Sequence, residues 1–250
     1  MKHARIFHQG RALWATVSPD EQTLILPDGG AVAAAEAQWL PPVAPGATIF
    51  ALGLNYADHS AELGFKAPSE PLVFLKGTGS FVGHEGVTPR PADANQMHPE
   101  CELVAVIGTP ARKVAKADAL SHVAGYTVAC DYAIREYLEN YYRPNARVKN
   151  RDATTPLGPW IVDAADIRDP QALALTTTVN GKTVQDGSTA DMVFDVATLI
   201  EYLSGFMTLM PGDMILTGTP HGVHFVSPGD EVVCTVEGVG RLVNRTAATR

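Results

Sequence analysis

Apolar residues along the chain are grouped in short runs, and few of these runs have helical spacing. The segments 49–56, 71–76, 102–108 and 119–131 are apolar enough to form buried strands. One segment, 194–209, instead repeats its apolar positions with the period of an amphipathic helix. The pattern therefore predicts a β-rich chain with a few helices.

Turn-forming residues separate many of these runs. Asn180-Gly181 lies between two alternating runs, which is a strong signal for a β-hairpin. The sequence Pro-Gly-Asp occurs at 211–213 and again at 228–230. Each copy is followed by a run rich in β-branched residues, so a strand is expected after each turn.

Two shorter helices are predicted beside these strands. The first covers 56–65, with Asn55 or Asp58 as its N-cap. The second covers 132–144 and ends at Pro144, because proline cannot continue a helix. Since strands do not alternate regularly with long helices, neither a doubly wound sheet nor a TIM barrel is expected.

The first part of the chain differs from the rest. Residues 1–46 consist of short strands and turns, and 40–48 carries three prolines and one glycine, a composition typical of a connection. We therefore expect a small N-terminal β-rich piece at 1–46 and a main domain at 47–250. The expected fold class is a β-rich α+β architecture.

Composition and charge narrow the possible classes of protein. The chain has 250 residues, 46% of them hydrophobic and 18% charged, which is typical of a globular protein with a sizeable core. Its formal net charge of −8 argues against general nucleic-acid binding. No apolar run approaches the roughly 18 residues that span a bilayer, and no signal peptide is recognised. A cytoplasmic protein with no membrane partner is expected.

The three cysteines are far apart in the sequence. Cys101, Cys130 and Cys234 are odd in number and contain no Cys-x-x-Cys spacing. A disulfide framework or a structural zinc site is therefore not expected, which also favours a cytoplasmic protein.

Three carboxylates stand at the ends of two predicted strands. Glu100 and Glu102 are two residues apart, so on a strand they point to the same face. Asp131 ends the next predicted strand. Either the glutamates are solvated and Asp131 is an ordinary helix cap, or the three form an oxygen site for a hard cation such as Mg²⁺ or Mn²⁺.

Two further patterns could serve acid–base chemistry and anion binding. His59 and Glu62 share one face of the first predicted helix, where a carboxylate can orient an imidazole as a general base. A basic run follows, with Arg143, Arg147, Lys149 and Arg151 within nine residues. The alternative in both cases is an ordinary solvated surface.

Two single residues are weaker candidates. Lys76 ends a predicted buried strand, where an amine needs a partner. Thr219 follows another strand in a Thr-Gly-Thr-Pro sequence, where hydroxyls and amides can bind a carboxylate. The same sequence is also compatible with a tight structural turn.

Six segments of the sequence, taken in order, resemble the fumarylacetoacetate hydrolase family. They are LNYADHSAEL, FLKG, HPECELVAVIG, GYTVACDYAIRE, VKNRDATTPLGP and PGDMILTGTP. The resemblance covers roughly residues 49–245. It implies a mixed β-sandwich roll of the family's C-terminal type, usually a homodimer, with Mg²⁺ or Mn²⁺ as cofactor.

The resemblance also implies roles for individual residues. The implied metal ligands are Glu100, Glu102 and Asp131. The implied catalytic residues are Lys149 and the lid dyad of His59 and Glu62, and the implied substrate-binding residues are Lys76, Arg135, Tyr142 and Thr219. The sequence departs from the family pattern at Gly77, where the family has proline, and in the segment after Lys149, so the choice of substrate is open.

One branch of the family is especially similar, namely the isomerase/decarboxylases of homoprotocatechuate (4-hydroxyphenylacetate) breakdown. The similarity is to their C-terminal half. It implies decarboxylation of 5-carboxymethyl-2-oxohex-3-enedioate, isomerisation of 2-hydroxyhepta-2,4-diene-1,7-dioate, or both. It further implies a small anionic 2-oxo acid substrate, and a homodimer or pairing with a homologous N-terminal-half subunit.

Three alternatives stay open at this point. Two are enzymes on the same scaffold: an acylpyruvate-type C–C hydrolase and an oxaloacetate decarboxylase. The third is a binding module in which a bound cation serves only stability.

Overall fold

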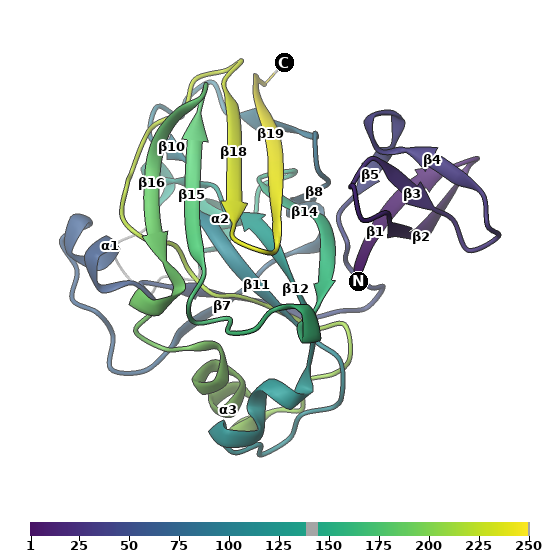
Figure 1. Ribbon diagram of the computed structural model, residues 1–250. Helices are drawn as coiled ribbons and strands as arrows, with labels where there is room; N and C mark the ends of the chain where they lie inside the picture. Colours follow the sequence, from purple (N-terminus) through teal and green to yellow (C-terminus); the bar gives the residue numbers. More distant parts are fainter. Residues whose placement is uncertain (139–144, 250) are drawn as a thin grey trace.

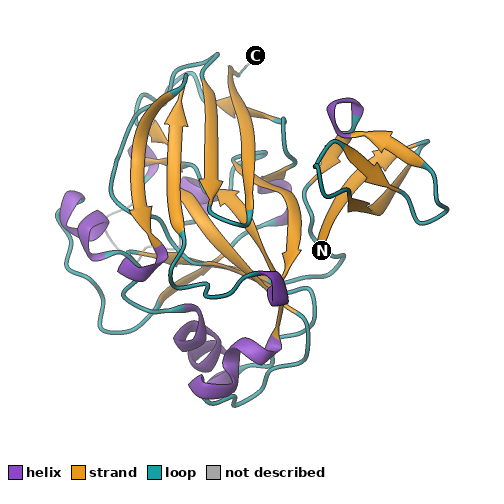
Figure 2. Ribbon diagram, in the orientation of Figure 1, coloured by secondary structure: helices purple, strands orange, loops and turns teal. Residues whose placement is uncertain are grey.

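Residues 1–138 and 145–249 are described in the computed structural model, and β-strands make up most of their regular structure (Figure 2). Two large sheets pack face to face, with the strands β11 and β12 of one lying behind β15, β18 and β19 of the other (Figure 1). The β-rich α+β fold predicted from the sequence is confirmed. No helix in the described ranges is long and apolar enough to cross a membrane.

The larger sheet is mixed. Its order is β4-β3-β2-β1-β14-β12-β11-β17-β6-β7, with β5 added to β1 and β8 to β14. Most neighbours are antiparallel, whereas β17 and β6 are parallel. Its strands are β1 (Lys2–His8), β2 (Arg11–Val17), β3 (Thr23–Ile25), β4 (Ala31–Ala33), β5 (Gln38–Leu40), β6 (Ile49–Gly53), β7 (Leu72–Leu75), β8 (Phe81–Val82), β11 (Cys101–Ile107), β12 (Val123–Cys130), β14 (Thr155–Asp163) and β17 (Met214–Leu216).

The smaller sheet has the order β16-β15-β18-β19-β9. Asn180 and Gly181 join β15 to β16 with φ angles of 49° and 78°, as a two-residue hairpin turn requires, so this prediction is confirmed. A separate short pair joins β10 to β13. These strands are β9 (Val87–Arg90), β10 (Met97–His98), β13 (Ala133–Ile134), β15 (Ala174–Val179), β16 (Lys182–Ser188), β18 (Glu231–Val236) and β19 (Gly240–Ala248).

Strand β11 lies at the centre of the molecule, and all of its residues are buried. Its alternate residues face different cores. Leu103 and Ile107 join the large core between the two sheets, whereas Val104 and Val106 join a second apolar cluster on the other face. Glu102 therefore shares its face with the second cluster.

The longest helix is α3 (Val196–Phe206), as the apolar period predicted. Asp195 caps it by accepting a 2.7 Å hydrogen bond from the Thr198 amide. The two shorter α-helices are α1 (Ala57–Glu62) and α2 (Ala146–Lys149). The 3₁₀ turns are η1 (Ala34–Glu36), η2 (Thr78–Ser80), η3 (Lys116–His122), η4 (Arg135–Tyr137), η5 (Ala164–Asp166) and η6 (Thr189–Asp191).

Two local predictions are wrong. The segment after Asp131 does not begin a helix, because Ala133 and Ile134 form β13 and pair with β10. The rest of the predicted helix, 139–144, lies outside the described residues. Neither Asn55 nor Asp58 caps α1, because the N-cap residue is Tyr56. The side-chain amide of Asn55 instead donates to the Thr217 carbonyl at 2.7 Å.

The first five strands form a lobe beside the sandwich (Figure 1). This lobe is joined to the main body through backbone pairing, because β1 pairs antiparallel with β14 from Lys2↔Val162 to Ala4↔Trp160. The boundary at residue 46 stays a prediction.

Candidate active site

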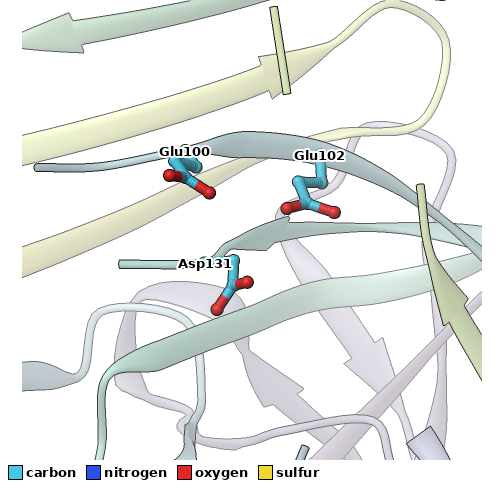
Figure 3. Close-up of side chains that lie close together, drawn as sticks. All are labelled: Glu100, Glu102 and Asp131. Atoms are coloured by element: carbon cyan, nitrogen blue, oxygen red, sulfur yellow. The ribbon is translucent and has the colours of Figure 1, made fainter. Parts of the chain in front are cut away.

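Three carboxylates converge at one end of the β11–β12 pair. Glu100, Glu102 and Asp131 each offer an oxygen, and these atoms lie within 4.8 Å of one another. All three side chains point into the same space (Figure 3). They are 5%, 1% and 1% exposed respectively, so they do not form an ordinary solvated strand end.

The strand register produces this convergence. Cys101 pairs with Cys130, so the residue before β11 and the residue after β12 lie opposite each other. Because side chains alternate, Glu100 and Glu102 point to one face of the sheet. Asp131 shares that face, since Ala129, two residues earlier, belongs to the same apolar cluster as Val104.

The donor set fits a hard divalent cation. Its ligand atoms are all carboxylate oxygens, which Mg²⁺ and Mn²⁺ prefer. Oδ2 of Asp131 is buried and has no hydrogen-bond partner, although the Lys149 ammonium lies 3.1 Å away. Glu102 is oriented by the Gly218 amide, which donates to its Oε2 at 2.6 Å. An oxygen-lined site of this kind can hold a metal ion.

Two lysines neutralise the carboxylates. The Lys149 ammonium, at the end of α2, contacts Oε2 of Glu100 and donates to the Asp131 carbonyl at 2.8 Å. The Lys76 side chain is 0% exposed, and its ammonium lies 2.7 Å from Oδ1 of Asp131. Lys76 also donates to the backbone carbonyl of Lys149. It therefore links the Asp131 side chain to the end of α2.

A third cation approaches from the other side of Glu100. An Nη of Arg135 donates to Oε1 of Glu100 at 3.0 Å. Its Nε donates to Nε2 of the buried His98 at 2.8 Å. Because an arginine Nε can only donate, His98 accepts this bond as a neutral imidazole.

Helix α1 covers the carboxylates. His59 Nδ1 lies 3.1 Å from Oε2 of Glu62, and His59 Nε2 lies 4.0 Å from Oε1 of Glu100. Glu62 also accepts hydrogen bonds from the amides of Gly222 and Val223, the latter at 2.9 Å. The predicted dyad is therefore assembled, and it is attached to the loop after β17.

A small cavity of about 60 Å³ lies beneath α1. Of the three carboxylates, Glu100 lines this cavity. One part of its wall is apolar, including Leu52, Leu63, Phe65, Phe74 and Val148. The polar side chains of the wall are His59, Glu100, Arg135, Asn145, Lys149 and Thr219.

Burial and neighbouring charges shift the pKa values in this cluster. Burial raises the pKa of Glu102 well above its usual range, and Asp131 adds to the effect. Burial also acts to raise the pKa of Glu100, but the charge of Lys149 outweighs it, with Arg135 adding to the effect, and the pKa is lowered. Lys149 has a raised pKa because Asp131 and Glu100 outweigh its burial.

The sequence matches the model of one protein family over most of its length. A family model described as fumarylacetoacetate (FAA) hydrolase C-terminal matches residues 48–247. The chain belongs to the fumarylacetoacetate hydrolase family. The resemblance seen in the six sequence segments is thereby confirmed.

Relatives within the fumarylacetoacetate hydrolase family include enzymes of aromatic breakdown. The chain is 59% identical over 204 residues to the 4-hydroxyphenylacetate degradation bifunctional isomerase/decarboxylase of Salmonella dublin, covering 82% of the chain and 48% of that protein. It is 61% identical over 201 residues to the enzyme of the same name from Escherichia coli, covering 80% and 47%. The chain thus spans about half the length of these curated relatives.

Solved structures of the family are also similar. The 5-carboxymethyl-2-hydroxymuconate delta-isomerase of Mycobacterium smegmatis is 35% identical, with a TM-score of 0.88 and full coverage of both chains. A fumarylpyruvate hydrolase of Pseudomonas aeruginosa in complex with Mn²⁺ and pyruvate is 31% identical, with a TM-score of 0.76 over 84% of this chain and 91% of that one.

Most residues that the family resemblance selected are brought together. They line the cavity together with Glu100, namely His59, Arg135, Lys149 and Thr219, and Glu62 contacts His59. Lys76 is close to them but does not line the cavity. Tyr142 and Arg143 lie outside the described residues.

The other arginines of the basic run face elsewhere. Arg147 and Arg151 stack over the Tyr137 ring at 4.3 and 5.2 Å. One residue of this cluster was missed from the sequence, namely His98. His98 lies in the same segment as Glu100, but nothing in the sequence connects it to Arg135.

Proposed function

We propose that this member of the fumarylacetoacetate hydrolase family decarboxylates 5-carboxymethyl-2-oxohex-3-enedioate, isomerises 2-hydroxyhepta-2,4-diene-1,7-dioate, or does both. The proposal includes Mg²⁺ or Mn²⁺ as cofactor and a cytoplasmic location. The observation that carries it is the buried cluster of three carboxylates under the His59–Glu62 dyad. The names of the relatives support the choice of substrate.

The charges of the cluster favour an anionic substrate. Three carboxylates are balanced by Lys76, Lys149 and Arg135. A divalent cation in the site would leave an excess of about two positive charges, which a substrate with two or more negative charges offsets. The carboxylates Glu100, Glu102 and Asp131 would hold the cation.

The chain's own residues supply the rest of the proposed chemistry. A divalent cation held by the three carboxylates would supply Lewis-acid chemistry toward the substrate's keto oxygen. When CO₂ leaves C5, the electrons of the broken bond move through the C3=C4 double bond to that oxygen. The Lys149 ammonium stabilises the negative charge where it develops, and Arg135 binds a substrate carboxylate.

A proton must then move along the resulting dienol. His59 is the proposed acid and base, because Glu62 lies at its Nδ1 and leaves Nε2 directed toward Glu100 and the cavity. Helix α1 excludes water while this happens. Because the cavity lies beneath α1, we infer that this helix moves to admit the substrate.

The length of the chain leads to a proposal about its partners. Because it spans half of its bifunctional relatives, a second half-length unit is expected to accompany it. That unit is either a second copy of the chain or a homologous N-terminal-half subunit. The molar mass of the native assembly, measured by light scattering on the purified chain alone, separates the two.

The test of the proposed function is an assay of the purified protein with 5-carboxymethyl-2-oxohex-3-enedioate. Substrate absorbance and released CO₂ are followed with Mg²⁺, with Mn²⁺ and with EDTA. Metal-dependent CO₂ release supports the decarboxylase. Absorbance changes with 2-hydroxyhepta-2,4-diene-1,7-dioate and no CO₂ release support isomerisation alone. Incorporation of ¹⁸O from water into cleaved acylpyruvates would contradict the proposal in favour of C–C hydrolysis.

A further inference from the structure

Gln185 connects both sheets to the loop that follows β17. It lies in β16 and is 2% exposed. Its side-chain oxygen accepts hydrogen bonds from the Cys101 amide at 3.1 Å and the Thr177 hydroxyl at 2.7 Å. Its nitrogen donates to the Pro220 carbonyl and to Oγ1 of Thr219, both at 2.9 Å. All four bonds of the amide group are made inside the protein.

The backbone partners fix the orientation of this amide. The Cys101 amide can only donate, and the Pro220 carbonyl can only accept. The Gln185 oxygen must therefore face β11, and its nitrogen must face the loop. As a result, Oγ1 of Thr219 accepts the hydrogen bond from Gln185. The proton of the Thr219 hydroxyl is then free to be donated to another group.

That proton has no protein acceptor among the residues that the structure describes. Thr219 is 3% exposed and lines the cavity beneath α1, together with Arg135 and Lys149. A buried hydroxyl that is held as a donor and directed by its partner needs an acceptor. A carboxylate bound in the cavity would provide one.

The loop is fitted closely against β16. A Cβ at Gly187 would lie 2.6 Å from the Pro220 ring, and one at Gly222 would lie 2.2 Å from the Val184 carbonyl. Only glycine permits this approach, so the loop can pack directly against β16 and within reach of Gln185. The contact of Thr219 with β16 is its hydrogen bond with Gln185.

We propose that Gln185 is a positioning residue, which holds the Thr219 hydroxyl as a hydrogen-bond donor to the carboxylate of a bound 2-oxo acid. This inference rests on the proposed function only in assuming that a 2-oxo acid binds in the cavity. It does not depend on which reaction follows.

The Gln185→Glu substitution tests this role with little change of shape. The introduced carboxylate can still accept from Cys101 and Thr177, but it cannot donate to Thr219. The Thr219 hydroxyl would donate to it instead, and its proton would be lost to the substrate. Gln185→Met removes the donor without adding a charge and serves as the second variant.

The measurement is the Kd of pyruvate for the Mn²⁺-loaded protein, obtained by calorimetry. Gln185→Glu, Gln185→Met and Thr219→Val are each expected to raise this Kd roughly tenfold, as loss of one hydrogen bond to a charged group does. Thr219→Ser keeps the hydroxyl and should stay near the wild-type value. Gln38→Glu places the same charge change at an exposed position of β5 and serves as the control.

A double-mutant cycle decides whether Gln185 acts through Thr219. Gln185→Met combined with Thr219→Val should raise the Kd no further than Thr219→Val alone. If the Kd of the double variant instead rises by the product of the two single effects, the proposal is overturned. An unchanged Kd in Thr219→Val would also overturn it, and this measurement remains decisive if the Gln185 variants fail to fold. Pyruvate binding without turnover of the proposed substrates would contradict the proposed function and leave this inference intact. Absence of pyruvate binding to the wild-type protein would overturn this inference, whereas the proposed function is decided by the turnover assay alone.

Discussion

Asp131 lies directly opposite Glu100 across the β11–β12 pair, and its backbone amide donates to the Glu100 carbonyl at 2.8 Å. Hydrogen bonds between the two backbones therefore hold two carboxylates of like charge close together, independently of any contact between their side chains. Their repulsion is offset by Lys149, which contacts both side chains. The convergence of these carboxylates is therefore a property of strand pairing. We expect substitution of one proposed ligand at a time to leave this pairing intact.

Glu102→Gln should abolish metal-dependent turnover in a protein that stays folded. The amide keeps the shape of the side chain and an oxygen that can accept from Gly218, but it removes one negative charge from the ligand set. We expect activity to fall on the order of a hundredfold or more and Mn²⁺ to bind more weakly. Calorimetric titration with Mn²⁺ measures the weaker metal binding, and circular dichroism checks that the protein stays folded. Wild-type turnover in this variant would contradict the ligand assignment.

Chelation should lower both stability and activity. EDTA is expected to lower the Tm, because an ion that binds only the native state stabilises it by mass action. Turnover should disappear and return when Mg²⁺ or Mn²⁺ is added in excess. A lower Tm with no catalytic activity under any metal condition would favour the binding-module alternative. Differential scanning calorimetry alongside the assay makes the distinction.

Lys76→Met should destabilise the fold. Lys76 is fully buried and paired with Asp131, so its removal leaves a buried carboxylate with one cation fewer. Loss of one partner of a buried pair typically costs about 3–5 kcal/mol. Urea unfolding of the metal-free protein measures the change, with Lys182→Met at the exposed start of β16 as the control. An unfolding free energy within about 0.5 kcal/mol of wild type would show that this pair contributes little.

Glu62→Gln should impair proton transfer more than metal binding. Glu62 contacts His59 and the 222–223 amides but belongs to no part of the carboxylate cluster. Loss of a positioned acid–base group typically lowers rates about 10²- to 10⁴-fold. We expect a fall of kcat toward this range, with the Mn²⁺ affinity unchanged. Equal losses in kcat and in metal affinity would instead point to collapse of the site.

Acid should weaken the fold through His84, which lies outside the active site. Burial, followed by the charge of Arg241, lowers the pKa of His84 to about 4. The unfolded chain takes up this proton near pH 6.5, whereas the native chain does so only near pH 4. Its contribution to stability is therefore complete above pH 6.5 and is lost as the pH falls toward 4, with a slope of up to about 1.4 kcal/mol per pH unit.

Urea unfolding at several pH values between 7 and 4 checks this expectation. The difference in unfolding free energy between wild type and His84→Gln should change across that window, since other titrating groups cancel in the comparison. His8→Gln serves as the control substitution. A constant difference would show that the His84 imidazole titrates alike in both states.

Much of the fold could be predicted because it depends on local pattern. Asn180-Gly181 marked the hairpin, and the apolar period of 194–209 marked α3. The segment after Asp131 could not be predicted in this way. Ala133 and Ile134 suit a helix as well as a strand, and their pairing with Met97 and His98 across the chain decides the outcome. Such pairing leaves no trace in the local sequence.

The residues of the site were also predictable where a local pattern marked them, and not where long-range contacts place them. Strand periodicity placed Glu100 and Glu102 on one face, and the end of the next predicted strand added Asp131. The family resemblance then selected Lys149 from the basic run. Gln185 could not be found, because its partners Cys101 and Thr219 lie 84 and 34 positions away. A polar residue at an inward position of a strand is a weak signal when its acceptors and donors are unknown.

The pairing of β1 with β14 has a practical consequence for anyone who wishes to express the main body alone. Removal of residues 1–46 would expose the backbone amides and carbonyls of β14 around Trp160–Val162. An unprotected strand edge of this kind is a template for association with other chains. A shortened chain should therefore form aggregates or strand-exchanged oligomers, although every proposed ligand and catalytic residue would still be present.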